Sequence, residues 1–229
     1  MTNSGDLYIV STPIGNLGDI TLRAIETLKK VDFVICEDTR VSGILLKKYE
    51  IENKLYVLNA GNEERKIDNY IKYIVEGKNA ALISDAGTPT ISDPGCRLVS
   101  KAKKNGINII GVPGANAALL AMSISGIPSD SFVYEGFLPQ KKGRQTKIKQ
   151  LFDEERTIIL YESMYRIEKL INELNEYMPD RLILVYRELT KMFEECWEGT
   201  PKEILTNFDQ KTVKGEFVVI IAPKKWRVE

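Results

Sequence analysis

The sequence predicts an α/β protein made of two α/β domains, the first with a mostly parallel sheet and the second with a mixed sheet. Three observations lead to this prediction. The chain has 229 residues, of which 43% are apolar, enough for a packed core. In its first half, short uninterrupted apolar runs alternate with helical patterns, as in parallel sheets covered on both faces. A turn-rich segment at 126–130 divides the chain into domains 1–127 and 128–229.

The first domain is predicted to alternate strands with helices. Uninterrupted apolar runs predict strands at 7–11, 31–36, 54–58, 80–83 and 107–112. Apolar residues at three- or four-residue spacing predict a first helix capped by Asp19, then helices at 39–49, 62–75, 94–104 and 115–125. In parallel sheets, ligands bind at the loops that leave the carboxyl ends of strands, so those loops are the expected site.

The second domain is predicted to mix strand and helix in the same way. Its strands are expected at 131–135, 157–161, 181–187 and 216–222. Its helices are expected at 143–152, which is basic, at 165–177, and in a short stretch after Thr200. The segment that ends at Trp197 has no clear pattern, and no element is predicted there.

The composition excludes several classes of chemistry. Basic and acidic residues balance at 32 each, so a nucleic-acid partner needs a local basic patch. There is no histidine, which removes the usual general base and the commonest transition-metal ligand. Cys36, Cys96 and Cys196 form no CxxC pair, which indicates a reduced, cytoplasmic protein without a metal site. Neither a signal peptide nor a membrane-spanning run is predicted.

The loop at 83–95, after the fourth predicted strand, is the strongest functional signal. It holds two acids, two glycines, two prolines and four hydroxyl residues, more than a turn requires. Asp85 lies just beyond the strand, where a carboxylate can accept hydrogen bonds from ribose hydroxyls or an amino group. Asp93 and Pro94 are typical of a helix start, so Asp93 is interpreted as an N-cap.

Two further loops follow the first and fifth strands, at 11–19 and 111–118. Their glycines allow a backbone to approach a ligand closely. The first is equally consistent with an ordinary strand-to-helix turn, and the second with close packing of a small-residue helix. No P-loop is present, and no GxGxxG follows the first strand, which argues against nucleoside triphosphatases and dinucleotide-binding domains.

Longer motifs carry a resemblance to a known family. They are LYIVSTPIGNLGDITLRA at 7–24, CEDTR at 36–40, ISDAGTPTISDPG at 83–95, YEGFLPQKKGR at 134–144, RELTK at 187–191 and KGEFVVII at 214–221. On these motifs, which extend over nearly the whole chain, the sequence resembles the tetrapyrrole methylase family, and within it the members that methylate ribosomal RNA. Where that pattern has histidines, this chain has Val41, Asn59 and the segment 161–166, which argues against a histidine mechanism.

The resemblance implies an enzyme with S-adenosylmethionine as methyl donor and no metal. Its acceptor would be the ribose 2′-hydroxyl of a cytidine in the decoding region of 16S rRNA, within an assembled small ribosomal subunit. It also implies a homodimer. Two alternatives remain open: a methyltransferase that acts on a carbon atom of a tetrapyrrole, and a non-catalytic module that binds the donor or the ribosome.

The resemblance also implies which residues bind the donor, with the last two contributed by the second domain: Pro13, Ile83, Ser84, Asp85, Gly87, Thr88, Asn116, Ala117, Tyr161 and Glu162.

A ribose hydroxyl is a weak nucleophile, so a general base is expected. Glu37 and Asp38 end the second strand at the same edge of the sheet. Lys191 is a second candidate, because a desolvated lysine can be neutral at working pH. Glu37 and Lys191 are therefore the candidate catalytic residues. The alternatives are that Asp38 or Thr39 caps the next helix and that Lys191 binds phosphate.

A basic run is predicted to hold the RNA phosphates. It consists of Lys141, Lys142, Arg144 and Lys147, continues to Lys149, and is joined by Arg40 from the first domain. A solvated helix face is the usual alternative for such a run. Tyr134 and Phe137 lie nearby in the sequence and are candidates for stacking an exposed base, although core packing is the commoner role of such residues.

Overall fold

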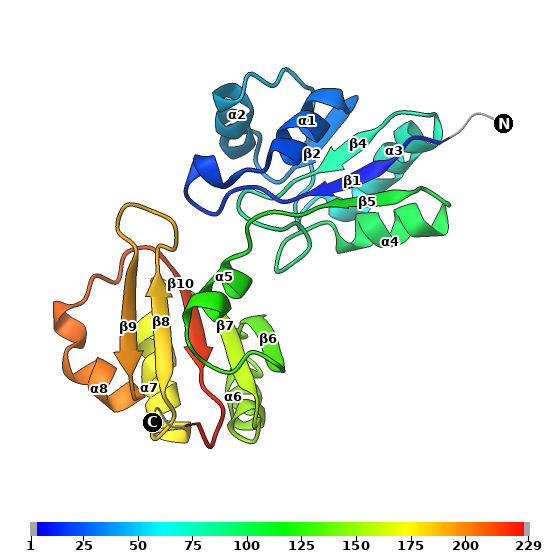
Figure 1. Cartoon of the computed structure of the whole chain (residues 1–229). Coiled ribbons are helices and arrows are strands. Elements are labelled where there is room, and N and C mark those ends of the chain that lie inside the picture. The colour runs from blue at the N-terminus through cyan, green and yellow to red at the C-terminus, as the bar shows by residue number, and fades with distance from the viewer. Residues whose placement is uncertain (1–3, 227–229) are drawn as a thin grey trace. The chain divides into compact units, whose positions relative to one another are not determined.

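The computed structural model describes residues 4–226, and the chain divides into two compact units, Met1–Asn116 and Ala117–Glu229 (Figure 1). This division precedes α5 (Ala117–Ile124), whereas the predicted boundary at 127/128 followed that helix. The reason is packing, because α5 buries Ala118, Ala121 and Met122 and contacts two strands of the second unit.

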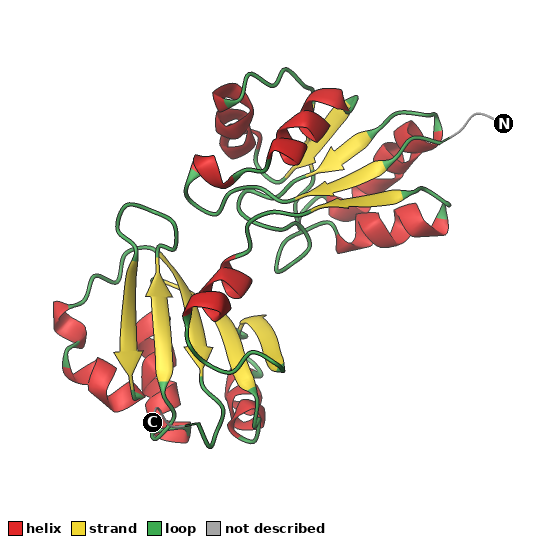
Figure 2. Ribbon diagram, viewed as in Figure 1, coloured by secondary structure: helices red, strands yellow, loops and turns green. Residues whose placement is uncertain are grey.

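The first unit is built around a five-stranded parallel sheet with the order β3-β2-β4-β1-β5, which confirms the predicted sheet (Figure 2). Its elements are β1 (Leu7–Val10), α1 (Leu22–Lys30), β2 (Phe33–Cys36), α2 (Thr39–Lys48), β3 (Leu55–Val57), α3 (Glu63–Val75), β4 (Ala80–Leu82), α4 (Cys96–Lys104) and β5 (Ile109–Val112).

Both faces of this sheet are buried, which explains its uninterrupted apolar strands. In β2, Phe33 and Ile35 pack with α3 and α4 on one face. The alternate residues Val34 and Cys36 lie in a second core with α1 and α2 on the other face. Because side chains in a strand alternate between the two faces, every position of such a strand must be apolar.

The place of β4 in the strand order makes the loops at the carboxyl edge of the sheet diverge. β4 lies between β2 and β1. The helices that follow these two neighbours cover one face, while α4, which follows β4, covers the other. The loop after β4 therefore leaves in the opposite direction from the loops beside it, which is where open α/β sheets bind ligands.

Two predicted helix starts were wrong. Asp19 does not cap α1: it ends a short 3₁₀ turn, Leu17–Asp19, and the Thr21 hydroxyl accepts from the Ala24 N–H instead (3.1 Å). Asp93 does not cap α4 either. That helix begins at Cys96, and its N-cap is Gly95, whose N–H donates to the Glu63 carboxylate (3.1 Å).

The second unit holds a mixed sheet with the order β6-β7-β10-β8-β9, in which only β6 and β7 are parallel. Its elements after α5 are β6 (Phe132–Phe137), α6 (Arg144–Phe152), β7 (Thr157–Ser163), α7 (Ile167–Tyr177), β8 (Ile183–Arg187), β9 (Glu195–Gly199), α8 (Pro201–Thr206), a 3₁₀ turn (Phe208–Gln210) and β10 (Glu216–Ile221). The core lies between one sheet face and the helices α6, α7 and α8. α5 contacts β7 and β10.

The strand β9 was missed from the sequence. It is an edge strand whose residues alternate between exposed polar side chains and the buried Trp197, so it shows no apolar run. None of the helices within residues 4–226 is long and apolar enough to cross a membrane.

Gly95→Ala is expected to lower the free energy of unfolding by about 1–3 kcal/mol, because a left-handed backbone strains any residue with a side chain. Gly95 has a φ of 117°, and an added Cβ would lie 2.6 Å from Leu82 Cδ2. Urea unfolding measures the change. Gly43→Ala, inside α2 with open space around it, is the control and should be neutral or stabilising. An equal loss in both variants would contradict this account of Gly95.

Candidate functional site

Loops from β1 and β4 are joined at the carboxyl edge of the first sheet. Beyond the strand ends, the Thr12 N–H donates to the Gly87 carbonyl (2.8 Å) and the Gly87 N–H donates to the Thr12 carbonyl (3.1 Å). The Thr12 hydroxyl also donates to the Ser84 carbonyl (3.0 Å). Two segments more than seventy residues apart therefore form one rigid surface.

The loop after β5 is attached to the same surface. The Thr88 hydroxyl accepts from the Ser11 hydroxyl (3.1 Å) and donates to the Ala115 carbonyl (3.1 Å). Gly114 lies so near the first loop that an added Cβ would be 2.9 Å from Ser11 Cβ. Sequence reasoning missed the joining roles of Ser11 and Thr12, whose only signal was their place directly after a strand.

These contacts separate the predicted donor residues into two groups. Pro13, Ile83 and Ser84 are buried, with Ile83 in the core and the Ser84 hydroxyl donating to the Gly87 carbonyl (3.2 Å). Their side chains shape the loops, so the predicted contacts of these three residues with the donor would use their backbone. Gly87 has a φ of 84°, which favours glycine.

The other predicted donor residues of this unit are partly exposed. Asp85 and Thr88 lie on the loop after β4, and Asn116 is the last residue of the unit. Ala117, the next residue, begins α5 in the second unit and is also partly exposed.

Acidic side chains gather at the ends of β2 and β4. The Asp85 carboxylate accepts from the Asp38 N–H (3.1 Å), which connects the two strand ends. Burial raises the pKa of Asp85, and the hydrogen bond from Asp38 opposes that rise. Asp93 belongs to this group and not to a helix cap, and burial raises its pKa too. In the sequence, the following Pro94 made Asp93 look like the N-cap of a helix, so its place among these acids was not predicted.

Glu37, a candidate general base from the sequence, is a half-buried acid at the end of β2. Burial raises the pKa of its carboxyl, and the charges of Asp85 and Asp93 raise it further. No group within residues 4–226 donates a hydrogen bond to this carboxylate. Burial and neighbouring like charges both favour the protonated form of a carboxyl group, which strengthens its carboxylate as a base.

Asp38 has the opposite character. Its carboxylate caps α2 by accepting from the Arg40 N–H (2.8 Å), and the Arg40 Nε donates to the same carboxylate (3.0 Å). Hydrogen bonds from Arg40 lower the pKa of Asp38 to about 2. Asp38 is therefore structural, as the helix-cap alternative stated. Arg40 remains exposed beside it.

In the second unit, the neighbours Tyr161 and Glu162 lie on opposite faces of the sheet. The Tyr161 hydroxyl accepts from the Ala118 N–H of α5 (3.1 Å). Glu162 is 1% exposed and lies on the helix-covered face. Because side chains alternate along a strand, the two side chains cannot both face one ligand, and the predicted donor contact of Glu162 would have to use its backbone.

Glu162 pairs with Arg166 (2.8 Å) and with Arg144, and the place of Arg144 also corrects a prediction. Arg144 was expected to bind RNA, but it is 2% exposed. Its guanidinium lies 3.2 Å from Glu162 and 2.8 Å from Glu173. A buried arginine bound to two carboxylates has no freedom to bind phosphate.

The remaining basic residues are accessible to different degrees. Lys141 and Lys142 are exposed, and within residues 4–226 their ammonium groups have no ion-pair partner. Lys147 is only partly exposed and pairs with Glu135 (2.7 Å).

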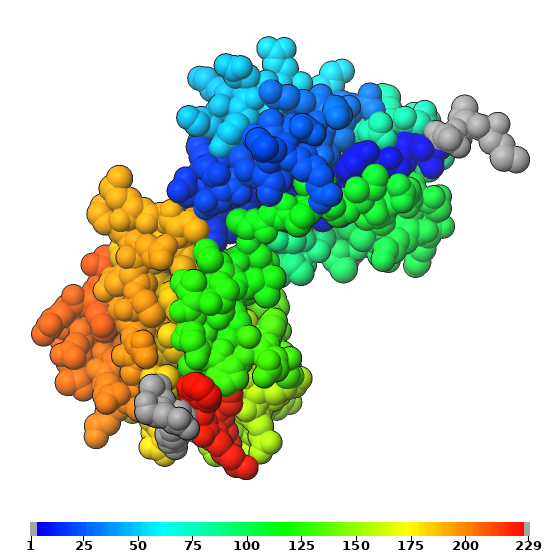
Figure 3. All heavy atoms as spheres, in the orientation of Figure 1, coloured from blue at the N-terminus to red at the C-terminus, as the bar shows by residue number. Residues whose placement is uncertain are grey.

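Lys191 lies in the segment that connects β8 and β9 beyond the ends of these strands (Figure 1), and this segment forms a protrusion on the surface of the second unit (Figure 3). Its ammonium donates to Glu188 and Glu216, both at 2.9 Å. Burial alone would lower the pKa of Lys191, but these carboxylates outweigh burial and the pKa is raised. Lys191 therefore lacks the neutral form that made it a candidate base.

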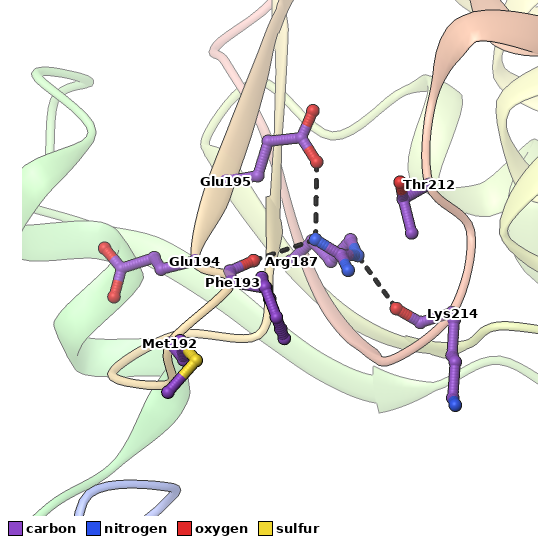
Figure 4. A pocket seen from close by; sticks show the side chains of 7 residues that line it. All are labelled: Arg187, Met192, Phe193, Glu194, Glu195, Thr212 and Lys214. Carbon is purple, nitrogen blue, oxygen red and sulfur yellow. Dashed lines mark hydrogen bonds and ion pairs between the residues drawn. The ribbon is translucent and has the colours of Figure 1, made fainter.

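The same segment bears a pocket of about 620 Å³, built around Arg187 (Figure 4). The guanidinium donates to the Phe193 and Lys214 carbonyls, both at 2.8 Å, and so holds the segment to the start of β10. Glu188 and Thr190 have φ values of 54° and 66°. Thr90 and Ser92, in the loop after β4, are strained in the same way, with φ values of 72° and 66°. Such strain is typical of functional segments.

Within residues 4–226, no cluster of side chains suitable for a metal ion is present.

Comparison with known proteins identifies the relatives of this chain. Residues 6–205 match the family described as Tetrapyrrole (Corrin/Porphyrin) Methylases. A protein of Thermotoga maritima named ribosomal RNA small subunit methyltransferase I is 41% identical over 96% of this chain and 100% of its own length. The protein of that name from Escherichia coli O157:H7 is 43% identical over 99% of this chain and 81% of its own length.

Solved structures with the same fold are more distant in sequence. A cobalt precorrin-4 methyltransferase has a TM-score of 0.71 at 18% identity, covering 95% of this chain and 94% of its own. A uroporphyrin-III C-methyltransferase of Thermus thermophilus, complexed with S-adenosylhomocysteine, has a TM-score of 0.67 at 17% identity, covering 96% and 98%. At this identity the likeness establishes the fold alone.

Arg144→Met is expected to lower the free energy of unfolding by about 3–5 kcal/mol, because it leaves the buried Glu162 without one of its charge partners. Lys141→Met, at an exposed position of the same basic run, is the control and should change stability by less than about 0.5 kcal/mol. Thermal unfolding of both variants checks the expectation. A stable Arg144→Met protein with weakened RNA binding would restore the original prediction for Arg144.

Proposed function

This chain belongs to the family of tetrapyrrole (corrin/porphyrin) methylases, and on that premise we propose that it methylates ribosomal RNA, with S-adenosylmethionine as donor. The acceptor is the ribose 2′-hydroxyl of a cytidine in 16S rRNA, presented by the small ribosomal subunit, and the enzyme works as a homodimer. The observation that carries the proposal is the joined set of loops after β1, β4 and β5. It lies at the edge where this fold binds ligands, and it carries the motifs shared with RNA methyltransferases.

Relatives favour RNA over a tetrapyrrole as acceptor. The proteins at 41% and 43% identity, matched over nearly the whole chain, are named for ribosomal RNA. The precorrin and uroporphyrin methyltransferases share only 18% and 17% of their residues with it. The exposed Lys141 and Lys142 offer cations to phosphates, as an RNA acceptor requires.

Asp85 and the backbone around Gly87 bind the donor in this proposal, and Glu37 serves the acceptor. The donor supplies a methyl group that is already strongly electrophilic. The protein's tasks are to orient the ribose and to receive its proton. Orientation contributes up to about 7–11 kcal/mol in favourable cases. The Glu37 carboxylate accepts the 2′-hydroxyl proton as the oxygen–carbon bond forms and the carbon–sulfur bond breaks.

The proposal is tested by incubating the protein with donor labelled in its methyl group and small subunits that lack the modification. Label on a cytidine 2′-oxygen supports it. Transfer to a tetrapyrrole and not to RNA would overturn it, and donor binding without any transfer would favour a non-catalytic module.

Asp85→Ala is expected to weaken donor binding at least tenfold, since a hydrogen bond to a charged group contributes about 1.5–3 kcal/mol. Asp85→Asn, which keeps an oxygen to accept from the Asp38 N–H, separates the charge from the structural contact and should also weaken binding. Asp130→Ala, at an exposed acid, is the control. Calorimetric titration with the donor measures all three. Unchanged affinity in both Asp85 variants would place the donor elsewhere.

Glu37→Gln is expected to lower kcat by about 10²–10⁴, the usual contribution of a general base. A base acts only when ionised, so the wild-type rate rises with pH through the pKa of Glu37, which lies above the ordinary glutamate range because of burial and the neighbouring acids. The variant should lose this dependence while its donor affinity stays the same. Rates at saturating substrates over a range of pH provide the check. A wild-type pH profile retained in the variant would exclude Glu37.

A further inference from the structure

We propose that Phe137, together with Lys141 and Lys142, forms a site for one unpaired nucleotide of RNA. The phenyl ring stacks on the base, and the two ammonium groups hold the flanking phosphates. This inference rests on the proposed function, because it states how the same RNA is held.

A β-bulge in β6 directs Phe137 to its position. Tyr134 pairs with Ile159 and Gly136 pairs with Leu160, so Glu135 is an extra residue, and Gly136 has a φ of 61°. If the register of Tyr134 and Ile159 continued without the bulge, Phe137 would pair with Glu162, on the helix-covered face. With it, Phe137 pairs with Tyr161 on the opposite face. Bulges that redirect a side chain are common beside functional sites.

The ring of Phe137 is held in place and is yet open to solvent. Its centroid lies 5.6 Å from that of Tyr161, which in turn lies 5.4 Å from that of Tyr134. The Tyr161 hydroxyl is fixed by the Ala118 N–H (3.1 Å). Phe137 nevertheless remains 52% exposed. An aromatic ring that is braced from one side and exposed on the other is arranged to stack on a flat partner with little loss of side-chain entropy.

The two lysines are presented by a turn that the buried ion pairs hold. Arg144 Nη1 donates to the Pro139 carbonyl (3.3 Å), while its guanidinium is bound by Glu162 and Glu173. Arg144 therefore positions the turn that carries Lys141 and Lys142. Both lysines are exposed, and within residues 4–226 their side chains have no acidic partner.

The charge of this segment favours RNA over a protein partner. Lys141 and Lys142, which have no acidic partner within residues 4–226, follow the ring of Phe137 within five residues. Phosphates on either side of a splayed base match this arrangement, because single-stranded RNA is held by stacking and by contacts to its backbone. A second copy of the chain that covered Phe137 would instead leave the two cations unused.

The test uses the full chain and two readouts: binding of a short fluorescein-labelled polycytidylate, and KM for small subunits that lack the modification. Phe137→Ala should weaken RNA binding and raise this KM by about 5- to 150-fold, the range for loss of one stacked base. Phe137→Trp, which keeps a flat ring, should stay within about threefold of wild type. Phe152→Ala, at another partly exposed phenylalanine, is the control. Donor affinity should be the same in all variants, which shows that each has folded.

The role of the lysines in binding phosphate is tested by measuring how RNA affinity depends on salt concentration. Replacing both Lys141 and Lys142 with Gln should reduce the slope of log affinity against log salt by about 0.7 for each lost phosphate contact. Replacing the exposed pair Lys103 and Lys104 is the control and should leave the slope unchanged.

Three outcomes would overturn the stacking site: unchanged RNA affinity in Phe137→Ala, an equal loss in Phe137→Trp, or a change only in oligomeric state. Failure of the proposed function looks different. In that case the wild type transfers no methyl group to RNA, while the dependence of polycytidylate binding on Phe137 is still measurable.

Discussion

Thr12 and Gly87 exchange a pair of backbone hydrogen bonds just beyond the ends of β1 and β4, and the candidate site depends on this contact. It is possible only because these strands are neighbours in the sheet and the left-handed Gly87 turns its chain toward Thr12. The hydroxyls of Ser11 and Thr88 then extend the contact to the loop after β5. Polar groups of these loops thus hold the loops to one another, while the Asp85 carboxylate accepts from the Asp38 N–H at the end of β2.

The acids near this contact lie in surroundings that destabilise their charged forms. Burial raises the pKa of Glu37, Asp85 and Asp93, which means that the folded state disfavours their charged forms. Folding stability contributed by these groups therefore decreases as pH rises from their unfolded pKa values through the folded ones. Asp38, which is tied to Arg40, shows how a neighbouring acid behaves when its role is structural: its pKa is lowered to about 2. Glu37 and Asp38, adjacent in the chain, therefore differ in character: the pKa of Glu37 is raised, whereas Asp38 caps α2.

In the second unit, adjacent residues of a strand also have different roles, because their side chains point to opposite faces of the sheet. Glu162 faces the helices and neutralises the buried Arg144, while its neighbour Tyr161 faces α5 and braces Phe137. The bulge at Glu135 adds one residue to β6 and so moves Phe137 from the core face to the exposed face. The buried ion pairs of Arg144 thus hold the turn that carries Lys141 and Lys142, while Phe137 is exposed on the other face of the sheet.

The sequence by itself determined the fold class, the parallel first sheet and the family, because apolar strands and long motifs are local properties of the chain. It also predicted the donor site in the loop at 83–95. It could not assign roles that depend on which atoms are neighbours. Arg144 is indistinguishable from Lys141 in a basic run until Glu162 and Glu173 are found beside it. Asp93 followed by Pro94 has the pattern of a helix start, but α4 begins later and leaves Asp93 among the acids. Burial and partners are properties of the packed chain, and only the tertiary structure decided them.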